Sequence, residues 1–263
     1  MLKESIILPS MGYPYKGILE GTSVFVKPIT TKVYKDFLVD STEDGVLNLI
    51  DSCLVDCPLK AEDFTFQDEL AIYLKIRCVS LGASLNVSSI CPHCREQESD
   101  IWNLMDLECT YLGLDEYPYK FILPDSKKEL EMILPTSKTQ RLARDEAQKR
   151  ATRFNKNLSD FLPIFSTVSL LHVPDAYDLV SKFDWYNTLS LMDAVYIDQI
   201  AEKLQDFGIS VSKERECHSC KKKYRVPLSI TSDFFRPGIG DLTGIKTAKG
   251  TLEKGPSDTA DLM

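Results

Sequence analysis

The chain has 263 residues and is 43% hydrophobic, which is enough apolar material to build one large domain or two modest ones. Its 31 basic and 39 acidic side chains give a formal net charge of -8, which disfavours binding mainly to phosphate backbones. The first residues lack the basic start and apolar run of a secretory signal, and no stretch reaches the ~20 apolar residues that span a bilayer. We therefore expect a soluble cytosolic protein, in which eight cysteines serve as thiols or metal ligands and not as a disulfide framework.

A hairpin and short helices are expected at the N-terminal end. Residues 17–20 and 23–27 are predicted as the two arms of a β hairpin, the second arm being rich in β-branched and aromatic residues. Thr30 or Thr31 then offers a helix cap before apolar residues that are spaced by three and four. A further helix is expected over residues 44–54.

A longer helix is predicted over residues 66–81, with Thr65 as its cap and Gly82 at its exit. Alternating residues after it predict a strand that runs into a first pair of closely spaced cysteines and returns as a hairpin. A second hairpin is expected from residues 119–124 and 130–134, which flank a polar turn.

The following segment is predicted to be helical. Residues 136–157 are polar and basic, which indicates an exposed helix that is either a solvated face or a docking surface for an acidic partner. An apolar helix over residues 161–171 and another opening at Pro174 come next. The strongest helical pattern then repeats at intervals of three and four, and it predicts a buried stripe that ends at Gly208. This stripe consists of Leu189, Met192, Tyr196, Ile200, Leu204 and Phe207.

Two Cys-x-x-Cys pairs, Cys91/Cys94 and Cys217/Cys220, carry the chemistry of the sequence. Zn²⁺ in structural sites takes four thiolate or imidazole ligands, and a two-residue gap lets one tight turn aim two sulfurs at one point. Strand-forming residues precede the first pair and follow the second, which is the layout of a zinc ribbon. The long segment between the pairs must itself fold to bring them together, and loop-closure cost grows slowly enough to permit this. We therefore predict one structural Zn²⁺ held by all four cysteines.

Other interpretations of the cysteines and histidines stay open. The two pairs could be unrelated turns or a redox-active pair. His93 and His218 lie between the paired cysteines and are expected to face solvent and not to ligate the metal. A second half-site is a weaker hypothesis for the other cysteines, because buried free cysteines are common small hydrophobes. These are Cys53, Cys57, Cys78 and Cys109.

Enzymatic function is not indicated. A zinc ion with four sulfur ligands has no open position at which to activate water. The sequence contains no glycine-rich phosphate loop, metalloprotease helix motif or nucleophile-elbow serine. His172 is the one histidine outside the two Cys-x-x-Cys segments, residues 91–94 and 217–220, which we call knuckles, and it is expected to be structural. We therefore expect a protein that is not an enzyme.

These elements together predict an α+β fold, in which split zinc-ribbon β hairpins flank a large and mainly helical insertion. The expected divisions are residues 1–60 (hairpin and helices), 61–135 (helix, first knuckle and hairpin), 136–208 (helical insertion), 209–237 (second knuckle and strand) and 238–263 (a flexible tail), with 61–237 forming one zinc-clamped unit.

Several short motifs, taken in their order, resemble those of a known family. They are Leu8-Pro9-Ser10 with Gly12 and Tyr13-Pro14-Tyr15, Val26-Lys27-Pro28-Ile29-Thr30, Cys91-Pro92-His93-Cys94, Leu134-Pro135-Thr136, and the Cys217-x-x-Cys220 strand that ends in Phe234-Phe235. Over most of residues 5–237 the chain resembles the baseplate hub assembly proteins of T-even-type contractile-tailed bacteriophages. The resemblance implies a non-enzymatic tail morphogenesis factor, a chaperone or scaffold that binds other hub or tail proteins, in the host cytoplasm or the virion baseplate.

Two other functions are weighed against this one. A nucleic-acid-binding zinc ribbon could use Lys221, Lys222, Lys223 and Arg225 beside the second knuckle, although this basic cluster is short. A thiol oxidoreductase built on one Cys-x-x-Cys pair is less well supported, because two such pairs match a metal site better.

Overall fold

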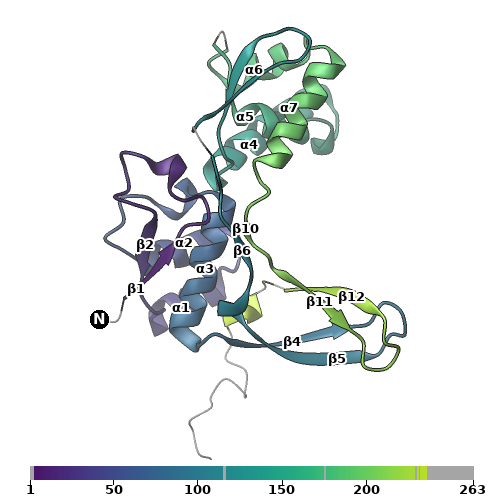
Figure 1. Cartoon of the computed structure of the whole chain (residues 1–263). Helices are drawn as coiled ribbons and strands as arrows, with labels where there is room; N and C mark the ends of the chain where they lie inside the picture. The colour runs from purple at the N-terminus through teal and green to yellow at the C-terminus, as the bar shows by residue number, and fades with distance from the viewer. Residues whose placement is uncertain (1–2, 115–116, 175, 229, 231, 236–263) are drawn as a thin grey trace, which may run out of the picture.

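The computed structural model describes residues 3–114, 117–174, 176–228, 230 and 232–235. These residues form seven α-helices and twelve short strands, and the strands pair in small antiparallel sheets of two or three. Figure 1 shows a lobe built around α1 to α3, a second and mainly helical lobe, and a long arm of strands that projects from the first. The expected α+β fold is confirmed. The predicted flexible tail, residues 238–263, lies outside the described residues.

The N-terminal sheet differs from the predicted hairpin. Strand β2 (Ser23–Val26) pairs with β1 (Glu4–Ile7) and with β3 (Leu54–Val55), so the predicted first arm at residues 17–20 is wrong. Gly17 has a φ of 83°, a left-handed conformation that interrupts an extended strand. The chain therefore loops out between β1 and β2, and a more distant segment supplies the partner strand.

The helices of this lobe begin where their caps predict. Helix α1 (Thr31–Val39) is capped by Thr30, and α2 (Glu43–Cys53) packs beside it. Helix α3 (Phe66–Leu81) starts at Thr65, whose hydroxyl accepts the N–H of Asp68 at 3.3 Å, and ends at Gly82 with a φ of 89°. These three predictions are confirmed.

A buried carboxylate joins the N-terminal loop to the start of α3. Asp68 is 0% exposed and accepts the backbone N–H of Ser10 at 2.8 Å and the hydroxyl of Tyr15 at 2.7 Å. The Tyr15 oxygen in turn accepts the N–H of Thr65 at 2.7 Å. Burial raises the pKa of both Asp68 and Tyr15, because removal from water disfavours their charged forms. In the N-terminal motif that runs from Leu8 to Tyr15, Ser10 and Tyr15 thus have a structural role, because both are held by Asp68.

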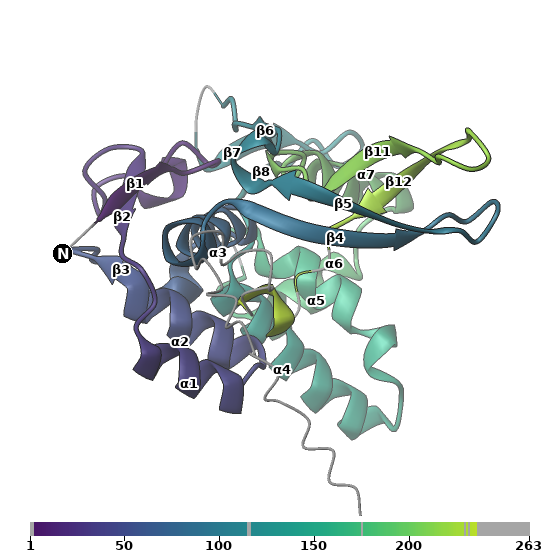
Figure 2. The same ribbon diagram turned by 90° about the horizontal axis from the view of Figure 1, so that it is seen from below.

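Two hairpins form the arm. Strands β4 (Ser84–Ile90) and β5 (Gln97–Asn103) pair along their whole length, and β11 (Ser212–Glu216) pairs with β12 (Lys223–Pro227). Both views show the hairpins side by side, with their loops at the same far end of the arm (Figures 1 and 2). The two segments that carry the cysteine pairs are therefore neighbours in space.

The second lobe contains the segment between the hairpins. It comprises β7 (Tyr119–Ile122), β8 (Glu129–Met132), β9 (Leu171–His172) and helices α4 (Ser137–Phe154), α5 (Leu162–Ser169), α6 (Leu179–Tyr186) and α7 (Leu191–Lys203). Its buried residues form a cluster separate from that of α1 to α3 and the arm. The predicted hairpin and helices are all present, although α6 begins later than Pro174 and the helical stripe is only partly buried.

The stripe prediction on α7 was wrong at its N-terminal end. Met192 is 64% exposed, whereas Asp193 is 1% exposed and Ile197 is fully buried. Asp193 turns inward because its carboxylate accepts two backbone N–H groups of the β7–β8 turn, from Asp125 at 2.8 Å and Ser126 at 3.1 Å. A polar contact thus sets which face of the first turn of α7 is buried.

Replacement of Asp193 by alanine is expected to lower the free energy of unfolding by about 1–3 kcal/mol, because the two N–H groups of the turn lose their acceptor. Chemical denaturation of the purified chain measures this loss. Gln199→Ala, an exposed position on the same helix, is the matched control and should leave stability within about 0.5 kcal/mol. Equal stability of both variants would contradict this account of the turn.

The basic helix α4 is only partly solvated. Ala143, Ala147 and Ala151 recur every four residues and are buried in the second lobe. Near its start, Arg141 forms ion pairs with Glu43, Asp44 and Glu62, and Lys138 contacts Asp63 at 3.1 Å. The N-terminal part of the helix therefore meets acidic groups of the first lobe of the same chain. Strands β6 (Cys109–Thr110) and β10 (Gly208–Ile209) pair where the chain passes between the lobes.

The last described residues return to the first lobe. Phe234 stacks on Tyr73 with ring centroids 5.6 Å apart, and Phe235 meets Phe37 edge to face. Arg77, which is fully buried, donates to the carbonyl of Phe234 at 2.9 Å. Among the helices of the described ranges, none combines the length and apolarity that a membrane crossing requires.

Candidate metal centre

The two knuckles are built alike. Arg95 and Lys221, each directly after the second cysteine of its pair, have φ values of 64° and 59°. Their N–H groups donate to the carbonyl oxygens of Cys91 and Cys217, both at 2.9 Å. The left-handed backbone conformation of this residue and its hydrogen bond to the first cysteine fold each Cys-x-x-Cys segment into a tight turn at the end of a regular hairpin.

The four sulfurs converge between the turns. Cys91 Sγ lies 3.7 Å from Cys220 Sγ, Cys94 Sγ lies 3.5 Å from Cys217 Sγ, and all four lie within 4.8 Å of one another. A tetrahedron with Zn–S bonds of about 2.3 Å has sulfurs roughly 3.8 Å apart, whereas a disulfide requires about 2.05 Å. All four are free cysteines. The donor set and its spacing therefore fit a tetrahedral thiophilic ion.

Sulfur ionisation depends on backbone groups and on the other sulfurs. Burial opposes ionisation of Cys91, but N–H groups of Cys94 and His93 favour its thiolate and lower its pKa to about 7. The N–H of Cys220 favours the Cys217 thiolate, yet burial and the neighbouring sulfurs raise its pKa to about 12. A divalent metal among the four sulfurs would favour the thiolate form of each of them.

A buried carboxylate links one hairpin to the other. Glu98 on β5 is 7% exposed and accepts the backbone N–H of His218 at 2.6 Å. It also contacts Arg215 Nε and the Tyr224 hydroxyl, each at 3.1 Å, while Ser89 of the first hairpin contacts that hydroxyl at 3.0 Å. Hydrogen bonds from the His218 N–H and the Tyr224 hydroxyl lower the pKa of Glu98 to about 2, so the carboxylate is charged at neutral pH. Glu98, Arg215 and Tyr224 were not identified from the sequence as parts of this site.

The basic cluster beside the second knuckle is partly neutralised within its own hairpin. Lys223 pairs with Glu214 at 2.8 Å, and Glu214 also lies opposite Arg225 in the β11–β12 register. Lys221 and Lys222 are exposed at the tip. The unpaired positive charge on this hairpin is thus smaller than the four basic residues in the sequence indicate.

The remaining candidate ligands lie elsewhere. In the described part of the chain, the only group of three or more potential ligands close enough to share an ion is the four-cysteine cluster. Cys53 is buried, and burial raises its pKa to about 11, while the other three cysteines outside the knuckles are half-buried. His93 and His218 are exposed, as expected.

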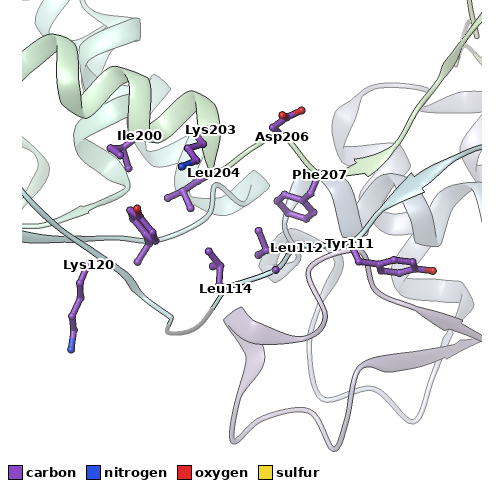
Figure 3. A pocket seen from close by; sticks show the side chains of 11 residues that line it. Tyr111, Leu112, Leu114, Lys120, Ile200, Lys203, Leu204, Asp206 and Phe207 are labelled. Carbon is purple, nitrogen blue, oxygen red and sulfur yellow. The ribbon is translucent and has the colours of Figure 1, made fainter.

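A groove of about 510 Å³ lies where the lobes meet, between the C-terminal end of α7 and the segment that leads into β7. Figure 3 shows its lining side chains, among which Lys120 and Lys203 point in different directions. Apolar residues such as Leu112, Leu204 and Phe207 supply much of the remaining wall. The groove is thus walled mainly by apolar side chains, with its charged groups at separate places.

The fold and site define a two-lobed α+β protein whose arm ends in a four-cysteine cluster made by two distant knuckles. A family model described as T4 bacteriophage base plate protein matches residues 11–236. The chain therefore belongs to this family, and the expected resemblance to a phage baseplate protein is confirmed at that level. Comparisons with curated proteins and with solved structures found no match.

Proposed function

We propose that this protein promotes assembly of the central hub of a phage tail baseplate, as a non-enzymatic scaffold or chaperone that binds other hub proteins. Membership of the baseplate family is the observation that carries this proposal. Partners are then other baseplate hub or tail proteins, which the protein meets in the host cytoplasm or in the virion baseplate. The projecting arm supports a binding role, because it presents extended surface away from the lobes (Figure 1).

We further propose that the arm is a split zinc ribbon, with one structural Zn²⁺ held by Cys91, Cys94, Cys217 and Cys220. Four sulfurs at tetrahedral spacing support the choice of ion and its structural role, because such a site leaves no position open for water. The metal would join the two hairpins, and the inserted lobe would be held at both ends. Residues 61–237 would then act as one zinc-clamped unit.

Co-expression tests the assembly role. A tagged full chain produced together with the baseplate proteins of its phage is expected to retain at least one hub protein through affinity purification and size exclusion. A phage protein from outside the tail, co-expressed in the same way, is the control and should not be retained. Failure to retain any tail protein at micromolar concentration would remove the main support for the proposal.

A further inference from the structure

The two knuckles differ at one informative position. The residue directly after the first cysteine is Pro92 in one knuckle and His218 in the other. Proline has no backbone N–H and its ring fixes φ, so this part of the first turn is rigid and needs no acceptor. His218 has a backbone N–H that needs an acceptor, and no ring fixes its φ. The second knuckle thus needs an acceptor group at this position that the first does not.

Glu98 supplies that group from the opposite hairpin. Its Oε1 accepts the His218 N–H at 2.6 Å and lies 3.2 Å from His218 Nδ1, while its Oε2 lies 3.1 Å from both Arg215 Nε and the Tyr224 hydroxyl. Both carboxylate oxygens therefore receive donors from the second hairpin. The side chains of Glu98 and Arg215 are only 5% and 15% exposed, so water competes little for these contacts.

The hydrogen bond acts on the residue next to a ligand. Cys217 and His218 share a peptide unit, so fixing the His218 N–H restricts the orientation of the Cys217 backbone and hence of its sulfur. A carboxylate beside four thiolates would repel them if it were unpaired. Arg215 offsets that charge, and its ion pair with Glu98 joins the two hairpins.

We infer that Glu98 is a positioning residue for the metal centre: it holds the second knuckle in ligating geometry and thereby sets metal affinity. This inference rests on the proposed metal binding by the four cysteines. Outer-shell partners of this kind typically change metal affinity by about 10–100-fold when they are removed. Glu98→Ala should therefore weaken Zn²⁺ binding to the full chain by about that factor.

Glutamine at this position is also informative. Its amide has one acceptor oxygen and one NH₂ group, so either orientation sets the NH₂ against donors of the second hairpin. Glu98→Gln should therefore weaken binding as well, with little change in side-chain volume. Glu214→Gln is the matched control, because Glu214 lies on the same arm but its side chain is 63% exposed and pairs only at the surface.

The experiment uses the full chain with Zn²⁺ in competition with a chromophoric chelator, and with Co²⁺ as a spectroscopic probe. Wild-type protein and Glu214→Gln should bind one ion tightly and give the absorption of tetrahedral cobalt with four thiolates. Both Glu98 variants should bind more weakly, release the ion faster and show reduced sulfur-to-cobalt charge transfer. A merely structural role would lower unfolding stability without altering that spectrum.

The outcomes separate the two proposals. If wild-type protein binds no ion, the proposed metal centre fails. If it binds one ion and both Glu98 variants match it in affinity and spectrum, the metal centre stands and the positioning role of Glu98 is overturned. Should Glu98→Ala fail to fold, which far-UV circular dichroism would reveal, the comparison of Glu98→Gln with Glu214→Gln decides the matter alone.

Discussion

If the four cysteines hold the proposed Zn²⁺, a chain carrying Cys217→Ser is expected to contain almost no zinc, whereas the wild-type chain should contain one ion. Cys217 is fully buried and its sulfur lies 3.5 Å from that of Cys94, so a serine hydroxyl would be a poor ligand in a site of soft sulfurs. Elemental analysis of the purified protein measures the loss. Cys109→Ser, at a half-buried cysteine outside the cluster, is the control and should retain its metal.

The effect on stability should be large but local. Free Zn²⁺ at about a thousand times its Kd stabilises the binding state by about 4 kcal/mol. For a chain of this size that corresponds to about 8–16 °C in the midpoint of the transition that includes the arm. A chelator added to the wild-type protein should produce the same shift, and Cys217→Ser should then show no further response to it.

Hydrogen exchange can locate the loss. Cys91 and Cys217 belong to the buried cluster that α3 shares with the arm, whereas the second lobe has a separate cluster. Amides of β11 and β12 should therefore lose protection in Cys217→Ser, while those of α4 and α5 keep most of theirs. Equal loss throughout the chain would show that the lobes do not unfold separately, and unchanged protection in the arm would contradict a clamping role for the metal.

The features that sequence analysis located well depend on contacts between near neighbours. The start of α3 follows from Thr65, whose side chain binds the N–H three residues later, and its end follows from Gly82. The knuckles follow from a spacing that itself encodes a tight turn. In each case the residues that determine the structure lie within a few positions of the feature.

Features that depend on distant partners were missed. Residues 17–20 were predicted to pair with β2, but its partner is Glu4–Ile7. Which segment pairs with β2 depends on how the chain between β1 and β2 folds, and this does not follow from the local sequence pattern. Asp193 could not be recognised as buried, since its partners are two amides of a turn more than sixty residues away. The same limit applies to Glu98, whose partners lie more than a hundred residues along the chain.

One signal for Glu98 was nevertheless present. Glu98 and Tyr224 each stand seven residues after the first cysteine of their pair, and both are buried. In two hairpins of the same register, such residues occupy equivalent positions, and here they contact one another at 3.1 Å. A carboxylate and a phenol at matching places beside two knuckles therefore indicate a contact across the pair.

Asp68→Ala is expected to lower the free energy of unfolding by about 3–5 kcal/mol. The substitution leaves the N–H of Ser10 and the hydroxyl of Tyr15 buried without their acceptor, and each such group costs about 1–3 kcal/mol. The N-terminal loop should also detach from α3, because Asp68 joins the two segments. Equilibrium denaturation measures the free energy, and proteolysis between β1 and β2 reports the loop.

Two further variants distinguish the network from general damage to the lobe. Tyr15→Phe keeps the edge-to-face contact with Phe64, whose ring centroid is 5.3 Å away, but removes the hydroxyl that bridges Asp68 and the Thr65 N–H. Tyr15→Phe is expected to lower the free energy of unfolding by about 1–3 kcal/mol, which is less than the loss expected for Asp68→Ala. Asp106→Ala, at an exposed carboxylate, should change stability by less than about 0.5 kcal/mol. If Asp68→Ala proved no worse than Asp106→Ala, the buried network could not be what fixes the loop to α3.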